Sequence, residues 1–224
     1  ALRRAQRWTP LPREQNPQRP SMPEDLEELL IEHGTSWQFG VALQLGRVTG
    51  RRNSAIRQLR WSDIDLSRAE VVWRGKTDKV GRQQVVPLPP RAVDILKNLE
   101  HRGIGNAPVF PSAADPTQPT PRDTFQVWLK RAKARAIKAA PESERDSLRL
   151  RLRGVGFHAE KRSFVRDPEF RNKPPKVQEA FVGTNHETLR KVYDEVTPDD
   201  LRAAMGFTSG PQGEANRERE PRVS

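Results

Sequence analysis

Apolar residues recur at helical spacing along most of this chain, with one interruption near the middle. Leu26, Leu29 and Leu30 fall on one face of a helix that begins at Pro23, with Ser21 or Met22 near its cap. The same spacing predicts helices over 36–50, 52–60, 90–101, 122–140, about 157–166, 175–183, 186–194 and 198–205. The expected inward positions on the earlier helices are Trp37, Val41, Leu43, Leu45, Val48, Ile56, Leu59, Phe125, Trp128 and Leu129.

The spacing changes to that of strands between residues 70 and 89. EVVWRG (70–75) and RQQVVPLP (82–89) are short β-branched runs on either side of a polar segment, which predicts two antiparallel strands joined by a turn. Residues 147–154, SLRLRLRG, alternate strictly between polar and apolar side chains, a pattern that is unusual between two helices. The predicted fold class is mainly α with a small antiparallel β-sheet (α+β).

Composition divides the chain into three parts. Residues 1–22 are rich in proline and show no apolar period, which predicts a linker or tail. Residues 23–205 form one predicted domain, and 206–224 are expected to be a disordered tail. No apolar run approaches the ~18 residues of a membrane span, and the start does not resemble a signal peptide. Because the chain also lacks cysteine, we expect a cytoplasmic protein without disulfides or thiol chemistry.

The chain is strongly basic, with 40 Lys and Arg against 29 Asp and Glu and a net charge of +11. This balance favours a polyanionic partner, and nucleic acid is the usual one for a basic protein. The excess is concentrated between Lys130 and Lys173, where there are fourteen Lys and Arg and six Asp and Glu. Any one of these helices is also typical of a solvated surface, but three consecutive basic elements favour a groove that follows DNA phosphates.

The candidate chemistry centres on Tyr193, the only tyrosine of the chain. A phenol oxygen that attacks a phosphodiester creates negative charge on the non-bridging oxygens, and a fixed arginine such as Arg52 stabilises that charge. A lysine in the turn between the two strands, Lys76 or Lys79, can protonate the leaving oxygen, and His158 can hold the phosphate or transfer a proton. Each residue alone is typical of an ordinary surface. The set in this order predicts phosphodiester cleavage without a metal or nucleotide cofactor.

The motifs that carry these residues resemble those of the tyrosine recombinase (phage integrase) family. TGRRNSAIRQLRWSDIDL (49–66) is similar to the first arginine motif of that family, and GKTDKVGRQQVVPL to its lysine hairpin. HAEKRSF (158–164) is similar to its HxxR motif, and GTNHETLRKVY (183–193) to the segment that leads to the nucleophile. The resemblance covers about residues 22–205 and implies a tyrosine recombinase catalytic-domain fold. It does not separate Lys76 from Lys79.

Two positions depart from the family pattern. The second catalytic arginine falls on Lys161, with Arg162 one residue later, and the usual His or Trp before the nucleophile falls on Thr184. A lysine keeps the charge but loses the bidentate fork that suits phosphate, whereas Arg162 lies about 100° further round the helix. His186 replaces Thr184 only if its loop is displaced. Losing one transition-state donor costs about 10²–10³ in rate, which slows such an enzyme without silencing it.

The resemblance implies a site-specific DNA recombinase or integrase. Tyr193 would form a 3′-phosphotyrosyl bond, and four chains would assemble on paired double-stranded sites by exchanging residues 195–205. Such a protein would be cytoplasmic and nucleoid-associated when bound to DNA. The alternatives are an impaired relative that only binds DNA, and a relaxing enzyme of the type IB topoisomerase kind. An RNA-binding protein is a further alternative, although the stacked aromatics of common RNA modules are absent.

Overall fold

The structure is a computed structural model that describes residues 20–75, 83–99 and 103–193, with side chains up to Leu189. Its helices are α1 (Glu24–Glu32), α2 (Trp37–Thr49), α3 (Asn53–Arg57), α4 (Pro90–Lys97), α5 (Arg122–Ala139), α6 (Arg145–Leu152), α7 (Phe157–Arg166), α8 (Pro168–Arg171), α9 (Pro175–Val182) and α10 (His186–Tyr193). Short 3₁₀ turns cover η1 (Trp61–Asp63) and η3 (Glu142–Glu144). The strands are β1 (Ile64–Asp65), β2 (Glu70–Trp73) and β3 (Gln84–Pro87), which form an antiparallel sheet in the order β1-β2-β3.

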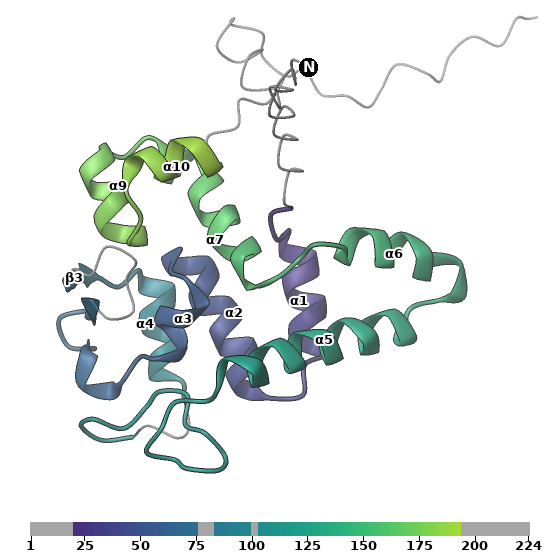
Figure 1. Cartoon of the computed structure of the whole chain (residues 1–224), viewed down its shortest axis with the longest axis horizontal. Coiled ribbons are helices and arrows are strands. Elements are labelled where there is room, and N and C mark those ends of the chain that lie inside the picture. The colour runs from purple at the N-terminus through teal and green to yellow at the C-terminus, as the bar shows by residue number, and fades with distance from the viewer. Residues whose placement is uncertain (1–19, 76–82, 100–102, 194–224) are drawn as a thin grey trace, which may run out of the picture.

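Helix α2 is the centre of the molecule, with α1, α3, α4 and α7 around it (Figure 1). It begins after Ser36, whose hydroxyl accepts a hydrogen bond from Gln38 N, and it ends at Gly50 in the left-handed conformation. Phe39 and Leu43 on this helix are fully buried. Phe39 packs edge-to-face on Phe157, which also contacts Phe125 of α5. The core therefore joins the first two helices to α5 and to the start of α7.

The predicted fold class is confirmed, and the structure corrects several details of the prediction, including a third strand, β1, beside the two that were predicted. Trp37 was expected inside but is 43% exposed, because it stands at the first position of α2 and stacks on Phe110 at 6.3 Å between ring centroids. The alternating residues 147–154 belong mainly to helix α6. Helix α8 was not predicted. The predicted helix over 198–205, the turn with Lys76 and Lys79, and the tail lie outside the described residues.

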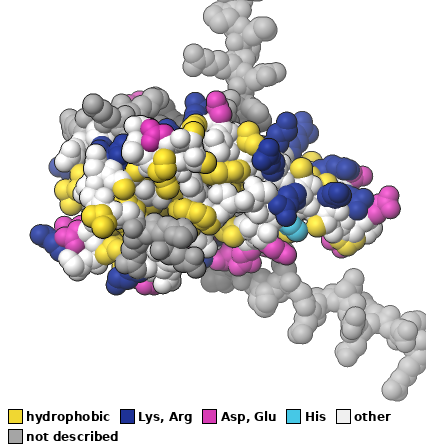
Figure 2. Space-filling view, turned by 90° about the horizontal axis from the view of Figure 1, so that it is seen from below, with side chains coloured by type: hydrophobic (Ala, Val, Ile, Leu, Met, Phe, Trp, Pro, Cys, Tyr) yellow, Lys and Arg dark blue, Asp and Glu magenta, His cyan; other side chains and the backbone are white. Residues whose placement is uncertain are grey.

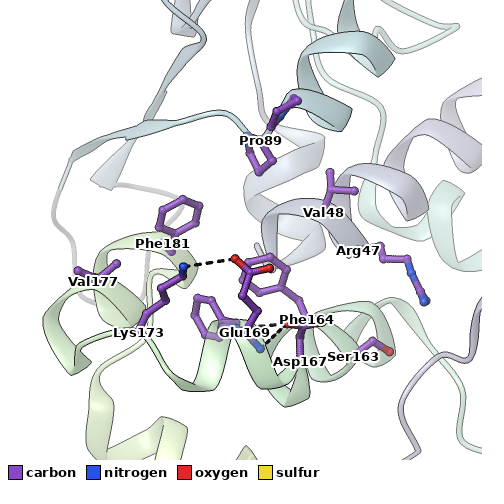
Figure 3. Close-up of a pocket in the computed structure, with 12 residues that line it drawn as sticks. Arg47, Val48, Pro89, Ser163, Phe164, Asp167, Glu169, Lys173, Val177 and Phe181 are labelled. Carbon is purple, nitrogen blue, oxygen red and sulfur yellow. Dashed lines mark hydrogen bonds and ion pairs between the residues drawn. The ribbon is translucent and has the colours of Figure 1, made fainter.

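A second, smaller hydrophobic cluster, formed by Val165, Phe170, Val182 and Leu189, joins the end of α7 to helices α8–α10. We call α8–α10 and the segments that connect them the C-terminal lobe. An open hollow of about 510 Å³ lies between this lobe and the ends of α2 and α4. Phe164 and Phe181 line it, and Glu169 and Lys173 form an ion pair beside them (Figure 3). The lobe therefore has fewer buried apolar side chains than the core around α2.

Residues 20–22, which we call the N-terminal strap, lie along α7. Met22 is buried, its N–H donates to Ser163 Oγ at 2.9 Å, and Ser163 Oγ donates back to Met22 O at 2.8 Å. Arg166 Nη1 donates to Ser21 Oγ at 3.0 Å. The strap is therefore fixed to the helix that carries His158 and Lys161, while the division of the whole chain into domains stays a prediction. Among the described helices, none is long and apolar enough to cross a membrane.

Candidate functional site

Arg52 is positioned by the sharp end of α2. Gly50 has φ 61°, and a Cβ there would lie 2.3 Å from a ring carbon of Phe164, so only glycine fits this turn. The turn sends two neighbouring arginines to different places. Arg51 is buried, donates to Gln84 Oε1 at 3.1 Å and lies over the Trp73 ring. Arg52 instead donates from Nη1 to Gly183 O and from Nη2 to Thr184 Oγ1, both at 3.1 Å.

Lys161 meets Arg52 at the same acceptor. Its side chain is fully buried, and Nζ donates to Val182 O at 2.7 Å and to Thr184 Oγ1 at 2.8 Å. The Thr184 hydroxyl oxygen therefore accepts from two cations that are 109 residues apart in the sequence. Bringing two like charges to one small neutral acceptor creates a strongly positive spot, which attracts an anion such as a phosphate.

His158 and Arg162 are on the same helix and differ in exposure. Helix α7 begins at Phe157, so His158 stands in its first turn, and its side chain is exposed. Arg162 Nε donates to the Pro20 carbonyl of the N-terminal strap at 2.7 Å, and the residue is 7% exposed. The sequence did not decide whether Lys161 or Arg162 binds the phosphate. In the structure Lys161 shares an acceptor with Arg52, whereas Arg162 is held by the strap.

A groove of about 630 Å³ opens beside these residues. Its charged and titratable lining consists of Arg52, Arg57, Arg122, His158 and Arg162. None of the described residues that line it is acidic. A single-sign lining of this kind focuses positive potential into the hollow and suits a polyanion.

Glu160 lies on the buried side of α7. It is fully buried, and Arg47 Nη1 lies 3.8 Å from its carboxylate while Arg47 Nε pairs with Glu27 of α1 at 3.1 Å. Burial, reinforced by the charge of Glu27 and opposed by Arg47, raises the pKa of Glu160 to about 9. Burial likewise raises the pKa of Glu27. The raised pKa favours the protonated, uncharged form of Glu160 at neutral pH.

Helix α10 brings Tyr193 into this part of the molecule. Asn185 caps α10 by accepting from Thr188 N at 3.0 Å, and Leu189 is buried in the small hydrophobic cluster. The helix packs on α7 and α9 and ends at Tyr193, of which the backbone is described. His186 occupies the first turn of α10. Thr184, two residues earlier, accepts the hydrogen bonds from Arg52 and Lys161. The hairpin candidates Lys76 and Lys79 lie outside the described residues.

Sequence reasoning missed Arg57, Arg122 and Glu160. Arg57 lies in the first motif, five residues after Arg52, and Arg122 is the first residue of α5. Both are basic residues at helix ends near predicted site elements, a signal that is available from the sequence but common on any basic surface. Glu160 gave no signal, because its burial depends on α1 and α2 packing against α7.

Lys and Arg side chains also gather at the end of the molecule that carries α6 and the second half of α5 (Figure 2). Arg131 and Arg135 on α5 are exposed there. Some basic residues of α6 are engaged in surface ion pairs, such as Arg149 with Asp146 and Arg151 with Asp25. These residues belong to the basic stretch 130–173, but of the Lys and Arg in that stretch only Arg162 lines the groove beside Arg52. Among the described residues, no group of three or more His, Asp or Glu side chains is arranged to hold a metal.

Comparisons with known proteins identify the family and the fold. The sequence profile of the phage integrase family matches residues 24–152. Prophage integrase IntA of Escherichia coli (strain K12) is 32% identical over 85 residues, so the match spans 38% of this chain and 21% of that integrase. The XerA recombinase superposes with a TM-score of 0.59 at 16% identity, covering 86% of this chain and 66% of that one. The Tn1549 transposon integrase in complex with a circular intermediate DNA superposes with a TM-score of 0.61 at 15% identity, covering 88% of this chain and 68% of that one.

Proposed function

Since the chain belongs to the phage integrase family, we propose that it cleaves and rejoins double-stranded DNA at specific sites through a 3′-phosphotyrosyl intermediate. The observation that carries this proposal is the meeting of Arg52 and Lys161 on the Thr184 hydroxyl. Tyr193 ends the helix that follows Thr184. Two cations beside a tyrosine-bearing helix match the needs of a phosphodiester that is attacked by a phenol oxygen.

The proposed cleavage is one displacement at phosphorus. The Tyr193 oxygen forms a bond to phosphorus as the bond to the 5′-oxygen breaks, and the phenol proton passes to His158. Lys76 or Lys79 gives a proton to the departing 5′-oxygen. Arg52 and Lys161 stabilise the charge on the non-bridging oxygens. Attack by a 5′-hydroxyl on the phosphotyrosine reverses these steps and releases the tyrosine, so no metal or nucleotide is consumed.

We assign the second cationic position to Lys161 rather than Arg162. Lys161 Nζ and Arg52 Nη2 share one acceptor oxygen, whereas Arg162 Nε is bound to a backbone carbonyl of the strap. A lysine is a point charge and lacks the planar fork of an arginine, so its contribution to phosphate binding is smaller than that of an arginine. The enzyme is therefore expected to be active and slower than a site with two arginines.

Double-stranded DNA is the proposed partner, and the exposed arginines of α5 and the basic groove would contact its phosphates. Assembly into tetramers through residues 195–205 is part of the same proposal. So is the cytoplasmic, nucleoid-associated location. The Tn1549 integrase was solved in complex with DNA, which supports the kind of partner and leaves the target sequence to experiment.

A trapping experiment tests this function. A pool of duplexes with random sequence around a nick is incubated with the chain, and covalent adducts are isolated under denaturing conditions. Cleavage near the nick releases a short fragment and prevents rejoining, so adduct accumulates. We expect adduct with the wild-type chain and none with Tyr193→Phe, while DNA binding by Tyr193→Phe is unchanged. Adduct formed by Tyr193→Phe would exclude the mechanism, and binding without adduct by the wild type would favour a DNA-binding relative.

A further inference from the structure

The basic groove continues beyond the candidate site along helix α3. Arg52 is the residue immediately before α3, and Arg57 is the last residue of this helix. Five residues of helix extend over about 7.5 Å. One strand of B-DNA carries a phosphate about every 3.4 Å along the helix axis. The backbone positions of the two arginines are therefore separated by about the spacing of phosphates one or two nucleotides apart.

Arg57 is held in place by a buried segment before α5. Its Nη1 donates to the Thr120 carbonyl at 2.7 Å. Thr120 is 3% exposed, and its hydroxyl lies 2.7 Å from Gln38 Oε1 and 2.8 Å from Pro111 O, either of which can accept its single proton. A guanidinium fixed in this way has already lost its side-chain entropy, so binding an anion costs less ordering. Among the described residues, no protein group accepts a hydrogen bond from Arg57 Nη2.

Arg122 adds a second positive charge from the facing element. It is the first residue of α5, its side chain is exposed, and it lines the same groove as Arg57. Burial and the nearby charge of Arg122 both lower the pKa of the Arg57 guanidinium, which indicates that the two charges oppose each other. No carboxylate of the described part of the chain forms an ion pair with either residue. An anion between them relieves this repulsion.

The residues between the two positions are polar and neutral. Asn53 and Ser54 of α3 and Gln126 of α5 line the groove together with the arginines. Hydroxyl and amide groups are the usual contacts to sugar and phosphate oxygens, and they position a strand without reading its sequence. The groove therefore offers one charged position at Arg52, a neutral polar stretch, and a second charged position at Arg57 and Arg122.

We infer that Arg57 and Arg122 bind a second phosphate of the DNA strand, one or two nucleotides from the phosphate that is cleaved. This inference rests on the proposed function for the identity of the strand. The second phosphate fixes the register of the strand in the groove, so that the scissile phosphate meets Arg52 and Lys161. Its binding is independent of sequence and of the cleavage step.

The first test is the salt dependence of binding to a random-sequence duplex, with all variants made in a Tyr193→Phe chain so that cleavage plays no part. The slope of log K against log salt is expected to fall by about 0.9 for each phosphate that the protein no longer neutralises. Arg57→Gln with Arg122→Gln should therefore lower the slope by about 1. The matched control removes two charges from exposed arginines outside the groove, Arg68→Gln with Arg91→Gln, and should leave the slope unchanged. Equal slopes for the two double variants would overturn the inference.

A second measurement locates the phosphate. Neutral methylphosphonate linkages are placed singly along the trapped duplex, and binding is measured for each. The chain that retains Arg57 and Arg122 should bind more weakly than to the unmodified duplex when the neutral linkage lies one or two nucleotides from the cleaved bond. The double variant already lacks this contact, so the same linkage should not weaken its binding. The variant Arg122→Gln alone, at an exposed position, keeps the test valid if changes at Arg57 impair folding. A variant as sensitive as the parent chain at every linkage would overturn the inference, while failure of adduct trapping would bear only on the proposed function.

Discussion

The two hydrophobic clusters of this protein differ in size, and the proposed site draws residues from both. The main core extends from α1 to the first half of α7 and includes the sheet, whereas the small cluster has four buried residues. Arg52 and Lys161 stand on elements of the main core. Thr184 and Tyr193 belong to the C-terminal lobe. The proposed nucleophile is thus on the part of the molecule with less apolar burial, which is the usual location of elements that move in function.

Polar contacts compensate for the small cluster at the boundary between the two regions. Arg52 donates to Gly183 O, Lys161 to Val182 O and Arg51 to Ala180 O. The hollow of about 510 Å³ lies along the same boundary (Figure 3). The cations that we propose to bind phosphate therefore also dock the lobe that carries Tyr193. Losing one of them should loosen the lobe and weaken catalysis together.

The largest expected difference comes from truncating one aromatic residue in each region. Phe125→Ala removes a fully buried ring from the main core and should destabilise the whole protein by about 3–5 kcal/mol. This lowers the melting temperature by roughly 10 °C for a domain of this size. Phe170→Ala removes a buried ring from the small cluster and should mainly lower the hydrogen-exchange protection of α9. Equal loss of protection in α2 for both variants would show that the two regions unfold as one unit.

A smaller effect is expected at Lys161, where the two regions meet. Lys161→Met removes a buried cation that makes two hydrogen bonds, so it should slow adduct formation by about 10²–10³ and lower hydrogen-exchange protection in α9. Lys161→Arg should restore both, because a guanidinium can reach the same acceptors and adds a planar donor. The matched comparison is Arg162→Ala. If that variant loses adduct while Lys161→Met retains it, Arg162 is the second cation.

The sequence predicted the helices well because their apolar spacing reflects burial against a core. The alternation in 147–154 did not predict the helix that these residues form. Leu148 and Leu152, four residues apart, lie on the buried face of that helix, whereas Leu150 is 69% exposed. The motifs placed Arg52, Lys161 and Thr184 in one candidate site. They gave no means to choose between Lys161 and Arg162, because that choice depends on the strap carbonyl of Pro20, which is 142 residues from Arg162 in the chain.

The last effect depends on pH and is expected at Glu160, on the buried side of α7. The raised pKa means that folding favours the protonated acid, so this stabilisation is complete below about pH 4.5 and is lost as the pH rises towards about 9. Glu160→Gln imitates the neutral acid, so it should match the wild type in stability below about pH 4.5 and become increasingly more stable than the wild type as the pH rises through 7. Urea unfolding should show that the wild type loses stability between pH 6 and 9 more steeply than Glu160→Gln. In the variant, the contribution of position 160 to the free energy of unfolding does not depend on pH. Parallel curves would mean that Glu160 is ionised in the folded protein.

The identity of the residue that joins the DNA tests the central proposal most directly. Adduct from the nicked duplex pool is digested with trypsin and nuclease, and the modified peptide is identified by mass spectrometry. We predict that the nucleotide is attached to the peptide of residues 192–202, on Tyr193 through a 3′-phosphate. Attachment to any other peptide, or an unmodified Tyr193 in isolated adduct, would contradict it.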